Sequence, residues 1–378
     1  MSPILLLTLA IATVGANSLA LSPLAAAVAV SFDTSAASVV QASAVYGAAT
    51  ALSALTLAPR ADGFGLRRSL VWALGVITIG LILSAGAIGV MSLSLGQALA
   101  GVGAGVALPV IYALAAELAP EGRESETLGR VLTGWTLSLV VGVALAAILA
   151  DLVHWRGVFA GMGLMTFVLA AILAPTAQGT ARTGARSAPL SALRVPGLWP
   201  ALLTAALFMA AFYGTYGYLG AHMTSVLGTS TTLAGISALS YGVGFGAVAP
   251  LDRLIDRFGT SRAAPMVFGA LIAVYLVLNV SAGAVWSLLT MCLVWGGVNH
   301  LGLNLIVSRL TALDRTQRGA ILGLYSATTY VAMFAGVAAM RPVFSALGFG
   351  AVASIGALCI VPAALMAVSR LLKERASR

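Results

Sequence analysis

Twelve apolar runs of about twenty residues each limit what this chain can fold into. A bilayer core about 30 Å thick is crossed by about 20 helical residues, and lipid tolerates only helices and closed barrels. The sequence therefore predicts an all-α integral membrane protein with twelve transmembrane helices. The expected spans are residues 5–29, 37–58, 69–90, 94–117, 127–150, 157–175, 198–221, 232–251, 263–282, 286–308, 319–340 and 347–370.

The distribution of charge supports this division. Only 8% of the residues are charged, whereas a soluble domain has roughly 25%. Eighteen of the twenty Lys and Arg residues fall on one side of the expected spans, and only Arg156 and Arg341 fall on the other. Because cytoplasmic loops collect cations, we expect both termini in the cytoplasm and a bacterial inner membrane location. The cations form no continuous basic face, so nucleic acid is not an expected partner.

A polar turn occurs twice in the chain. Residues 60–68 read Arg-Ala-Asp-Gly-Phe-Gly-Leu-Arg-Arg, and residues 256–262 read Asp-Arg-Phe-Gly-Thr-Ser-Arg, with equivalent positions 194 residues apart. This offset predicts a tandem duplication. We expect an N-terminal six-helix half at residues 1–175 and a C-terminal six-helix half at residues 198–378. Residues 176–197, rich in Ala, Thr, Ser, Gly and Arg, are expected to form a cytoplasmic linker.

The repeated turn resembles the Gly-x-x-x-Asp-Arg-x-Gly-Arg-Arg loop of the major facilitator superfamily, although Gly63 replaces the arginine after the acid. The resemblance implies two six-helix halves related by pseudo-two-fold symmetry, which rock about a central site. It also implies that the turns brace the closed cytoplasmic face. The expected gating residues are Asp62, Arg67, Arg68, Asp256 and Arg257.

Two further segments resemble one branch of that superfamily. Residues 97–105 are similar to the Arg-x-x-x-Gly-x-Gly motif of proton-linked members, with Gln97 in place of the arginine. Residues 151–159 resemble the Gly-Trp-Arg-x-x-Phe segment of the twelve-span drug and sugar efflux branch, the drug:proton antiporters. A degraded antiporter signature at residues 138–147 favours plain helix packing. The resemblance implies a proton-coupled exporter of a small organic molecule.

Candidate substrate-binding residues are polar or aromatic side chains near the middle of the spans. Asn17 lies at the centre of span 1, and its alternative role is a hydrogen bond between helices. Tyr213 and Tyr216 belong to an aromatic cluster on span 7, which is also typical of an interfacial belt. Tyr46 on span 2 and Tyr325 on span 11 are included because those helices face the cavity in the family resembled.

Span 10 carries Asn299, His300 and Asn304 near its centre. An ionisable group at this depth is costly and indicates function, so we interpret His300 as a substrate-binding and proton-coupling residue. We expect Asn304 to hold the imidazole in one tautomer. The alternative is a neutral histidine bonded to a neighbouring helix. The other candidate coupling residues are Glu117 and Asp33, whereas His154 and His222 are expected at the surface.

Two other functions stay open at this stage. One is an importer of a metabolite or transition metal, for which Met291, Cys292 and His300 form a thin cluster of soft ligands, although residues 291 and 300 lie on opposite helix faces. The other is a polytopic membrane enzyme, but the sequence offers no Ser/His/Asp or His-rich set. We expect no enzyme activity, cofactor or bound metal, and without a Gly-x-x-x-x-Gly-Lys-Ser/Thr motif no ATP-driven step. The expected partners are a small-molecule substrate, the proton and the lipid bilayer, and the protein is expected to be a monomer.

Overall fold

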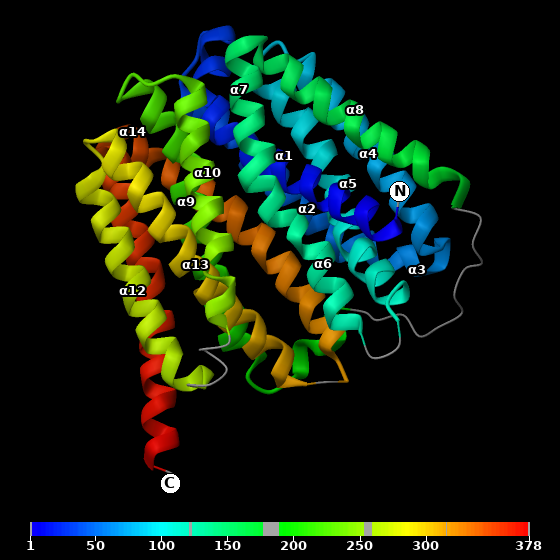
Figure 1. Ribbon diagram of the computed structural model, residues 1–378, viewed down its shortest axis with the longest axis vertical. Coiled ribbons are helices and arrows are strands. Elements are labelled where there is room, and N and C mark those ends of the chain that lie inside the picture. Colours follow the sequence, from blue (N-terminus) through cyan, green and yellow to red (C-terminus); the bar gives the residue numbers. More distant parts are fainter. Residues whose placement is uncertain (1, 121–122, 177–188, 253–258, 315, 377–378) are drawn as a thin grey trace.

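The computed structural model describes residues 2–120, 123–176, 189–252, 259–314 and 316–376, and within these ranges the chain is a bundle of helices without strands (Figure 1). The N-terminal helices are α1 (Pro3–Ser31), α2 (Ala36–Thr56), α3 (Ala61–Phe64), α4 (Leu66–Ala85), α5 (Val90–Glu117), α6 (Glu124–Leu137), α7 (Ala144–Leu152) and α8 (Trp155–Leu173). A π-helical segment, Ser138–Val143, joins α6 to α7. The C-terminal helices are α9 (Leu198–Ser225), α10 (Thr231–Ala247), α12 (Thr260–Ser281), α13 (Val285–Leu313) and α14 (Arg318–Ala376).

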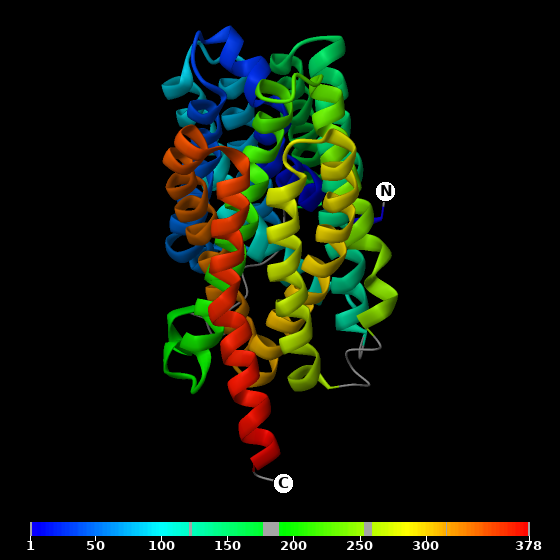
Figure 2. The same ribbon diagram turned by 90° about the vertical axis from the view of Figure 1, so that its left-hand side faces the viewer.

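The prediction of membrane-spanning helices is confirmed. In the described residues, eleven helical stretches are long and apolar enough to cross a membrane. The last of them, α14, is interrupted at Gly348, whose φ of 79° and ψ of −176° are not helical. The orange and red parts of α14 form two legs that are joined at their upper ends (Figure 2). The expected spans at residues 319–340 and 347–370 fall on these two legs.

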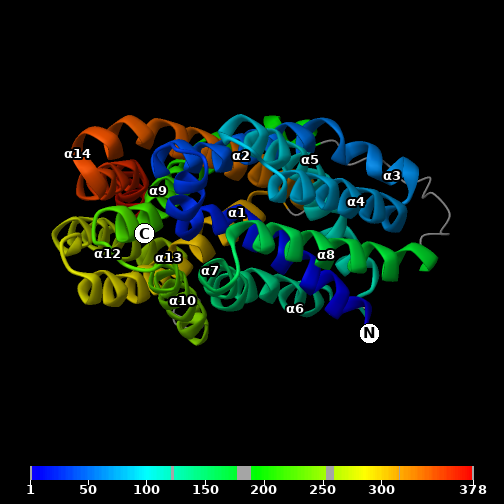
Figure 3. The ribbon, with the colours of Figure 1, turned by 90° about the horizontal axis from the view of Figure 1, so that it is seen from above.

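The bundle has two ends, which we call the apex and the base. The apex carries the α1–α2, α4–α5, α7–α8, α9–α10 and α12–α13 connections and is uppermost in Figure 1. The base is the opposite end, at which α2, α5 and α13 end and where the C-terminal end of α14 lies. Seen from above, α4, α5 and α8 lie on one side of the molecule and α12 and α14 on the other (Figure 3).

The repeated turn has the same backbone conformation where both copies are described. Gly65 precedes α4 with φ 87° and ψ 131°, and Gly259 precedes α12 with φ 83° and ψ 137°. Side chains rarely adopt this region, so glycine is needed at both positions. In the first copy the Ser69 hydroxyl donates to the Ala61 carbonyl at 3.2 Å, which ties α4 to α3.

The two cations at the apex have structural partners. Arg156 donates to the Ala87 carbonyl at 2.9 Å, and its guanidinium lies 4.3 Å from the centre of the Trp155 ring. Arg341 donates to the Ser38 hydroxyl at 2.9 Å. These contacts explain why two arginines occur on the side of the membrane that otherwise lacks cations.

One surface assignment from the sequence was wrong. His222 is 6% exposed, its Nε2 lies 2.7 Å from the Ala282 carbonyl oxygen, and its ring stacks on Phe349 at 5.0 Å. The second leg of α14, which carries Phe349, covers this histidine. His154, by contrast, is exposed and its Nδ1 accepts from the Arg156 amide at 3.2 Å.

Small residues set the closest helix crossings. At the α10–α13 crossing, a Cβ on Gly244 would collide with the Leu293 backbone, and a Cβ on Gly296 would collide with the Tyr241 backbone. The two glycines thus bring these helices into backbone contact, as small residues do between membrane helices.

We expect Gly244→Val to prevent stable folding, because the added methyl groups have no free volume at this crossing. Overpacking of this kind costs about 1–3 kcal/mol or more. The measurements are the yield of monodisperse protein and its thermal unfolding in detergent. The matched control is Gly269→Val in α12, where no atom lies within 4 Å of an added Cβ. Equal stability of the two variants would contradict the packing argument.

Candidate functional site

A small cavity lies between the N-terminal and C-terminal helices. It is narrow, and its empty volume of about 210 Å³ includes space that is open to solvent. Its lining comes from α1, α2, α9 and α14, and none of the lining side chains is charged. The lining residues are Ser18, Leu19, Ser22, Ser43, Tyr213, Tyr216, Gly217, Met333 and Val337.

A pair of tyrosines lies one helical turn from the cavity lining, toward the base. Tyr46 of α2 and Tyr330 of α14 make an edge contact with ring centroids 6.3 Å apart. Gly47 allows this approach, because a Cβ there would lie 3.0 Å from the Tyr330 carbonyl oxygen. The hydroxyls of Tyr46, Tyr216 and Tyr330 are buried without a hydrogen-bond partner in the described part of the chain.

On the apex side of the cavity, α1 and α9 are joined through one serine. The Ser22 hydroxyl donates to the Tyr216 carbonyl at 2.6 Å and accepts from the Gly220 amide at 3.2 Å. A Cβ on Gly220 would collide with the backbone of Ser22 and Pro23. The absence of a side chain at Gly220 therefore allows α1 and α9 to come into backbone contact at this point.

Further hydrogen bonds join the two sets of helices at the apex. Gln41 donates to the Tyr218 hydroxyl at 2.7 Å, and that hydroxyl donates to the Val337 carbonyl at 2.8 Å. The Asp151 carboxylate accepts from the Thr232 amide at 2.6 Å, where it lies at the positive N-terminus of α10. We call these contacts, with Ser22–Tyr216, Ser22–Gly220 and Arg341–Ser38, the apex seal.

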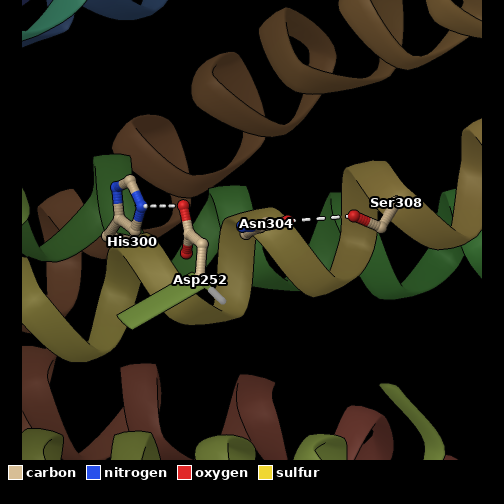
Figure 4. Close-up of polar contacts among 4 residues, drawn as sticks. All are labelled: Asp252, His300, Asn304 and Ser308. Carbon is tan, nitrogen blue, oxygen red and sulfur yellow. Dashed lines mark hydrogen bonds and ion pairs between the residues drawn. The ribbon is translucent and has the colours of Figure 1, made fainter. Parts of the chain in front are cut away.

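A histidine of α13 and the acid that follows the 3-10 turn Ala249–Leu251 face each other. His300 Nε2 lies 3.1 Å from Asp252 Oδ2, with the side chains 17% and 31% exposed. Figure 4 shows the imidazole directed at the carboxylate. The Phe245 ring contacts His300 edge-on at 4.7 Å. A protonated imidazole here can donate to the carboxylate, so the pair can hold and release a proton.

The expected contact between Asn304 and His300 is not formed. Asn304 Oδ1 accepts from the Ser308 hydroxyl at 2.9 Å, and its side chain runs along α13 away from His300 (Figure 4). Asn304 and His300 are one turn apart, yet Asp252, which follows the 3-10 turn Ala249–Leu251, is the group that faces the ring.

Asn17 forms the interhelical bond that was its alternative interpretation. Its Nδ2 donates to Gln97 Oε1 at 3.1 Å, and Gln97 Nε2 donates back to Asn17 Oδ1 at 3.3 Å. Gln97 also donates to the Ser84 hydroxyl at 3.1 Å. Asn17 is 2% and Gln97 0% exposed, and neither lines the cavity.

We expect Gln97→Leu to destabilise the protein by about 1–3 kcal/mol, because it leaves the buried Asn17 amide without its partner. The double variant Asn17→Leu/Gln97→Leu should recover much of that loss, since both polar groups are then removed. Thermal unfolding of the single and double variants measures the coupling. Additive effects would show that the amides do not support each other.

The sequence profile of the Major Facilitator Superfamily matches residues 6–337 of the chain. The chain belongs to this superfamily. It is therefore a multi-pass membrane protein and a secondary transporter. A relative is the uncharacterized MFS-type transporter YwfA of Bacillus subtilis (strain 168), which is 27% identical over 365 residues, covering 94% of this chain and 88% of the relative.

The other predicted binding residues of this superfamily member lie outside the cavity lining. Asn299 is 3% exposed and donates to the Tyr241 hydroxyl at 2.6 Å, which joins α13 to α10. Tyr325 and Asn304 are half-buried. Of the predicted set, Tyr213 and Tyr216 alone line the cavity, and both are buried within the bundle at 7% and 2% exposure rather than in an interfacial belt.

The remaining predicted residues lie at the two ends of the bundle. Asp33, in the α1–α2 turn, and Glu117, at the end of α5, are exposed, and Asp33 has a φ of 48°. Arg67 and Arg68 are exposed in the first turn of α4. Asp62 lies in α3, but its side chain, with Asp256 and Arg257, is outside the described residues.

Sequence reasoning missed three contributors to these sites. Asp252 stands one residue beyond the expected span 232–251, so a search for polar residues near the middle of the spans does not select it. Gln41 belongs to no motif that would single it out. Arg341 is one of the two cations on the cation-poor side of the expected spans, and this is the one sequence feature that points to it. In the described residues, no three His, Cys, Asp or Glu side chains gather as metal ligands.

Proposed function

We propose that this protein is a proton-coupled exporter of a small organic molecule that works by alternating access. The observation that carries the proposal is the cavity, which lies between the two sets of helices and is closed at the apex by hydrogen bonds between them. A central site that is sealed at one end is what an alternating-access carrier has in one of its two states.

The proposed architecture has twelve spans in two six-helix halves related by pseudo-two-fold symmetry. The two legs of α14 serve as spans eleven and twelve. The symmetry is supported by the Ser22–Tyr216 hydrogen bond, whose residues are 194 positions apart, the same offset as the repeated turn. Equivalent positions of two repeats touch each other where the symmetry axis passes, so we place the axis through the apex side of the cavity.

In the proposed orientation the base faces the cytoplasm, because eighteen of the twenty cations belong to that side. In this orientation the apex seal closes the outer face, and we propose a monomer in a bacterial inner membrane. Export is supported by the likeness of residues 151–159 to the efflux branch. The proton is assigned to the His300–Asp252 pair.

The test is transport by the purified protein in proteoliposomes with an imposed pH gradient. In vesicles where the cytoplasmic face of the protein points outward, an acidic lumen should drive accumulation of a substrate inside the vesicle. The substrate is sought in a panel of antibiotics, sugars and metabolites, and a proton ionophore should abolish the accumulation. Accumulation with the opposite gradient direction identifies an importer. Counterflow without any response to pH would contradict proton coupling.

The repeated turns are proposed to brace the closed cytoplasmic face. We expect Asp62→Asn to lower the initial transport rate severalfold, because the variant loses the acid of the repeated turn that precedes α4. Transport is measured in proteoliposomes, with size-exclusion profiles to show that the variant is folded. An unchanged rate would show that the turn acts only as a connection.

A further inference from the structure

The cavity between the halves is bordered by phenol hydroxyls that lack hydrogen-bond partners. Tyr46, Tyr216 and Tyr330 are 1%, 2% and 2% exposed, and within the described residues no group bonds their hydroxyls. Burying a hydroxyl without a partner is costly, so most buried polar groups are satisfied. Three such groups at one site indicate that a partner comes from outside the chain.

All three phenols belong to the cavity or to the next helical turn. Tyr216 lines the cavity. Tyr46 follows the lining residue Ser43 by three positions, and Tyr330 precedes the lining residue Met333 by three, a spacing that keeps each pair on one helix face. The contact between the Tyr46 and Tyr330 rings brings the two halves together there.

The lining offers no charge to a ligand. None of the nine lining residues is ionisable in the neutral range, and no carboxylate is among them. The ring of Phe212 packs against those of Tyr213 and Tyr216 with centroids 4.9 and 5.5 Å apart, so these rings are engaged with each other rather than open to a cation. Gln97, at the position of the family's arginine, is satisfied by Asn17 and Ser84.

We propose that this cavity binds an uncharged molecule that joins a hydrogen-bond acceptor, such as an amide, ketone or ether, to an apolar or aromatic body. The phenol O–H groups donate to the acceptor, while Leu19, Met333 and Val337 contact the body. A charged ligand would lose its hydration without gaining a counter-ion. The inference rests on the proposed function, because it takes the cavity as the transport site.

The two halves both contribute to this recognition. Tyr46 comes from the N-terminal half and Tyr330 from the C-terminal half, so one acceptor between their hydroxyls contacts both. Ligand binding at that position favours the state in which α2 and α14 are close. The same hydroxyls therefore select the ligand and link its binding to the movement of the halves.

The test uses the full chain in lipid nanodiscs and aryl compounds in matched sets of three. Each set has one ring system bearing a carboxamide, a carboxylate or an aminomethyl group, which makes it neutral, anionic or cationic. Binding is measured by thermal shift and then by equilibrium titration. We expect carboxamides to bind more tightly than their charged counterparts. Tyr46→Phe, Tyr216→Phe and Tyr330→Phe should each weaken carboxamide binding by about five- to tenfold.

The matched control is Tyr275→Phe. The Tyr275 hydroxyl is also buried without a partner, but this residue packs against Trp295 inside the C-terminal half and does not line the cavity. Carboxamide binding by this variant should equal that of the parent. Three results would overturn the inference: charged compounds that bind as tightly as carboxamides, no carboxamide binding at all, or cavity tyrosine variants that bind like the parent.

A failure of the proposed transport function would be distinguished from a failure of the proposed ligand class by comparing binding with transport. If carboxamides bind through the three tyrosines but no compound is transported in proteoliposomes, the binding site stands and the proposed transport fails. If charged compounds are transported and carboxamides are not bound, the proposed transport stands and the ligand class is wrong.

Discussion

His300→Gln is expected to abolish transport driven by a pH gradient while leaving substrate counterflow intact. Glutamine retains a side chain that can donate to Asp252 Oδ2, which His300 Nε2 faces at 3.1 Å. It cannot carry a proton, whereas an imidazole can. Gradient-driven accumulation should therefore fall to the background of protein-free vesicles. Counterflow, which needs only substrate binding and the rocking of the halves, should continue.

Two further variants make this result specific. Asp252→Asn removes the acid that orients the ring and should cause the same uncoupling, with no additional loss in the double variant. His154→Gln changes an exposed histidine at the apex and should transport like the parent. If His300→Gln accumulates substrate as the parent does, the histidine has a structural role. The coupling group must then be sought at Glu117 or Asp33.

Gly220→Val is expected to abolish transport by preventing closure of the apex. A valine side chain at this position would collide with the backbone of Ser22 and Pro23. The collision exists only when α1 and α9 are in contact. A cost of about 1–3 kcal/mol confined to one of two states shifts their ratio by roughly 5- to 150-fold. The variant should therefore fold but remain open toward the outside.

The measurement is the labelling of a cysteine placed in the cavity. With Cys292→Ala and Cys359→Ala as background, Ser18→Cys should react slowly with a membrane-impermeant thiol reagent applied from outside. Adding Gly220→Val should accelerate this reaction and stop transport. Gly269→Val, at a position without neighbours within 4 Å of an added Cβ, should change neither. Slow labelling in the Gly220 variant would argue against an apex seal.

The membrane class, the approximate positions of the helices and the repeated turn can be read from the amino-acid sequence alone. Length and apolarity are local properties, and in lipid every backbone group must be satisfied within its own helix. The expected spans therefore overlap observed helices, with two of the twelve falling on the single helix α14. Glycine at positions 65 and 259 is also a local signal. A residue without a Cβ adopts a positive φ at little cost, so these glycines mark where the chain turns.

The tertiary structure alone decided which side chains meet. Asp252 and His300 are 48 residues apart, Asn17 and Gln97 are 80 apart, and Gln41 and Val337 are 296 apart. In a soluble helix an apolar stripe indicates the buried face. These helices are apolar on all sides, because lipid accepts the same residues as the interior of the bundle. Their rotation is fixed by backbone contacts at glycines such as Gly244 and Gly220, and by single polar bonds such as that of Ser22, so the sites become visible only when the helices are assembled.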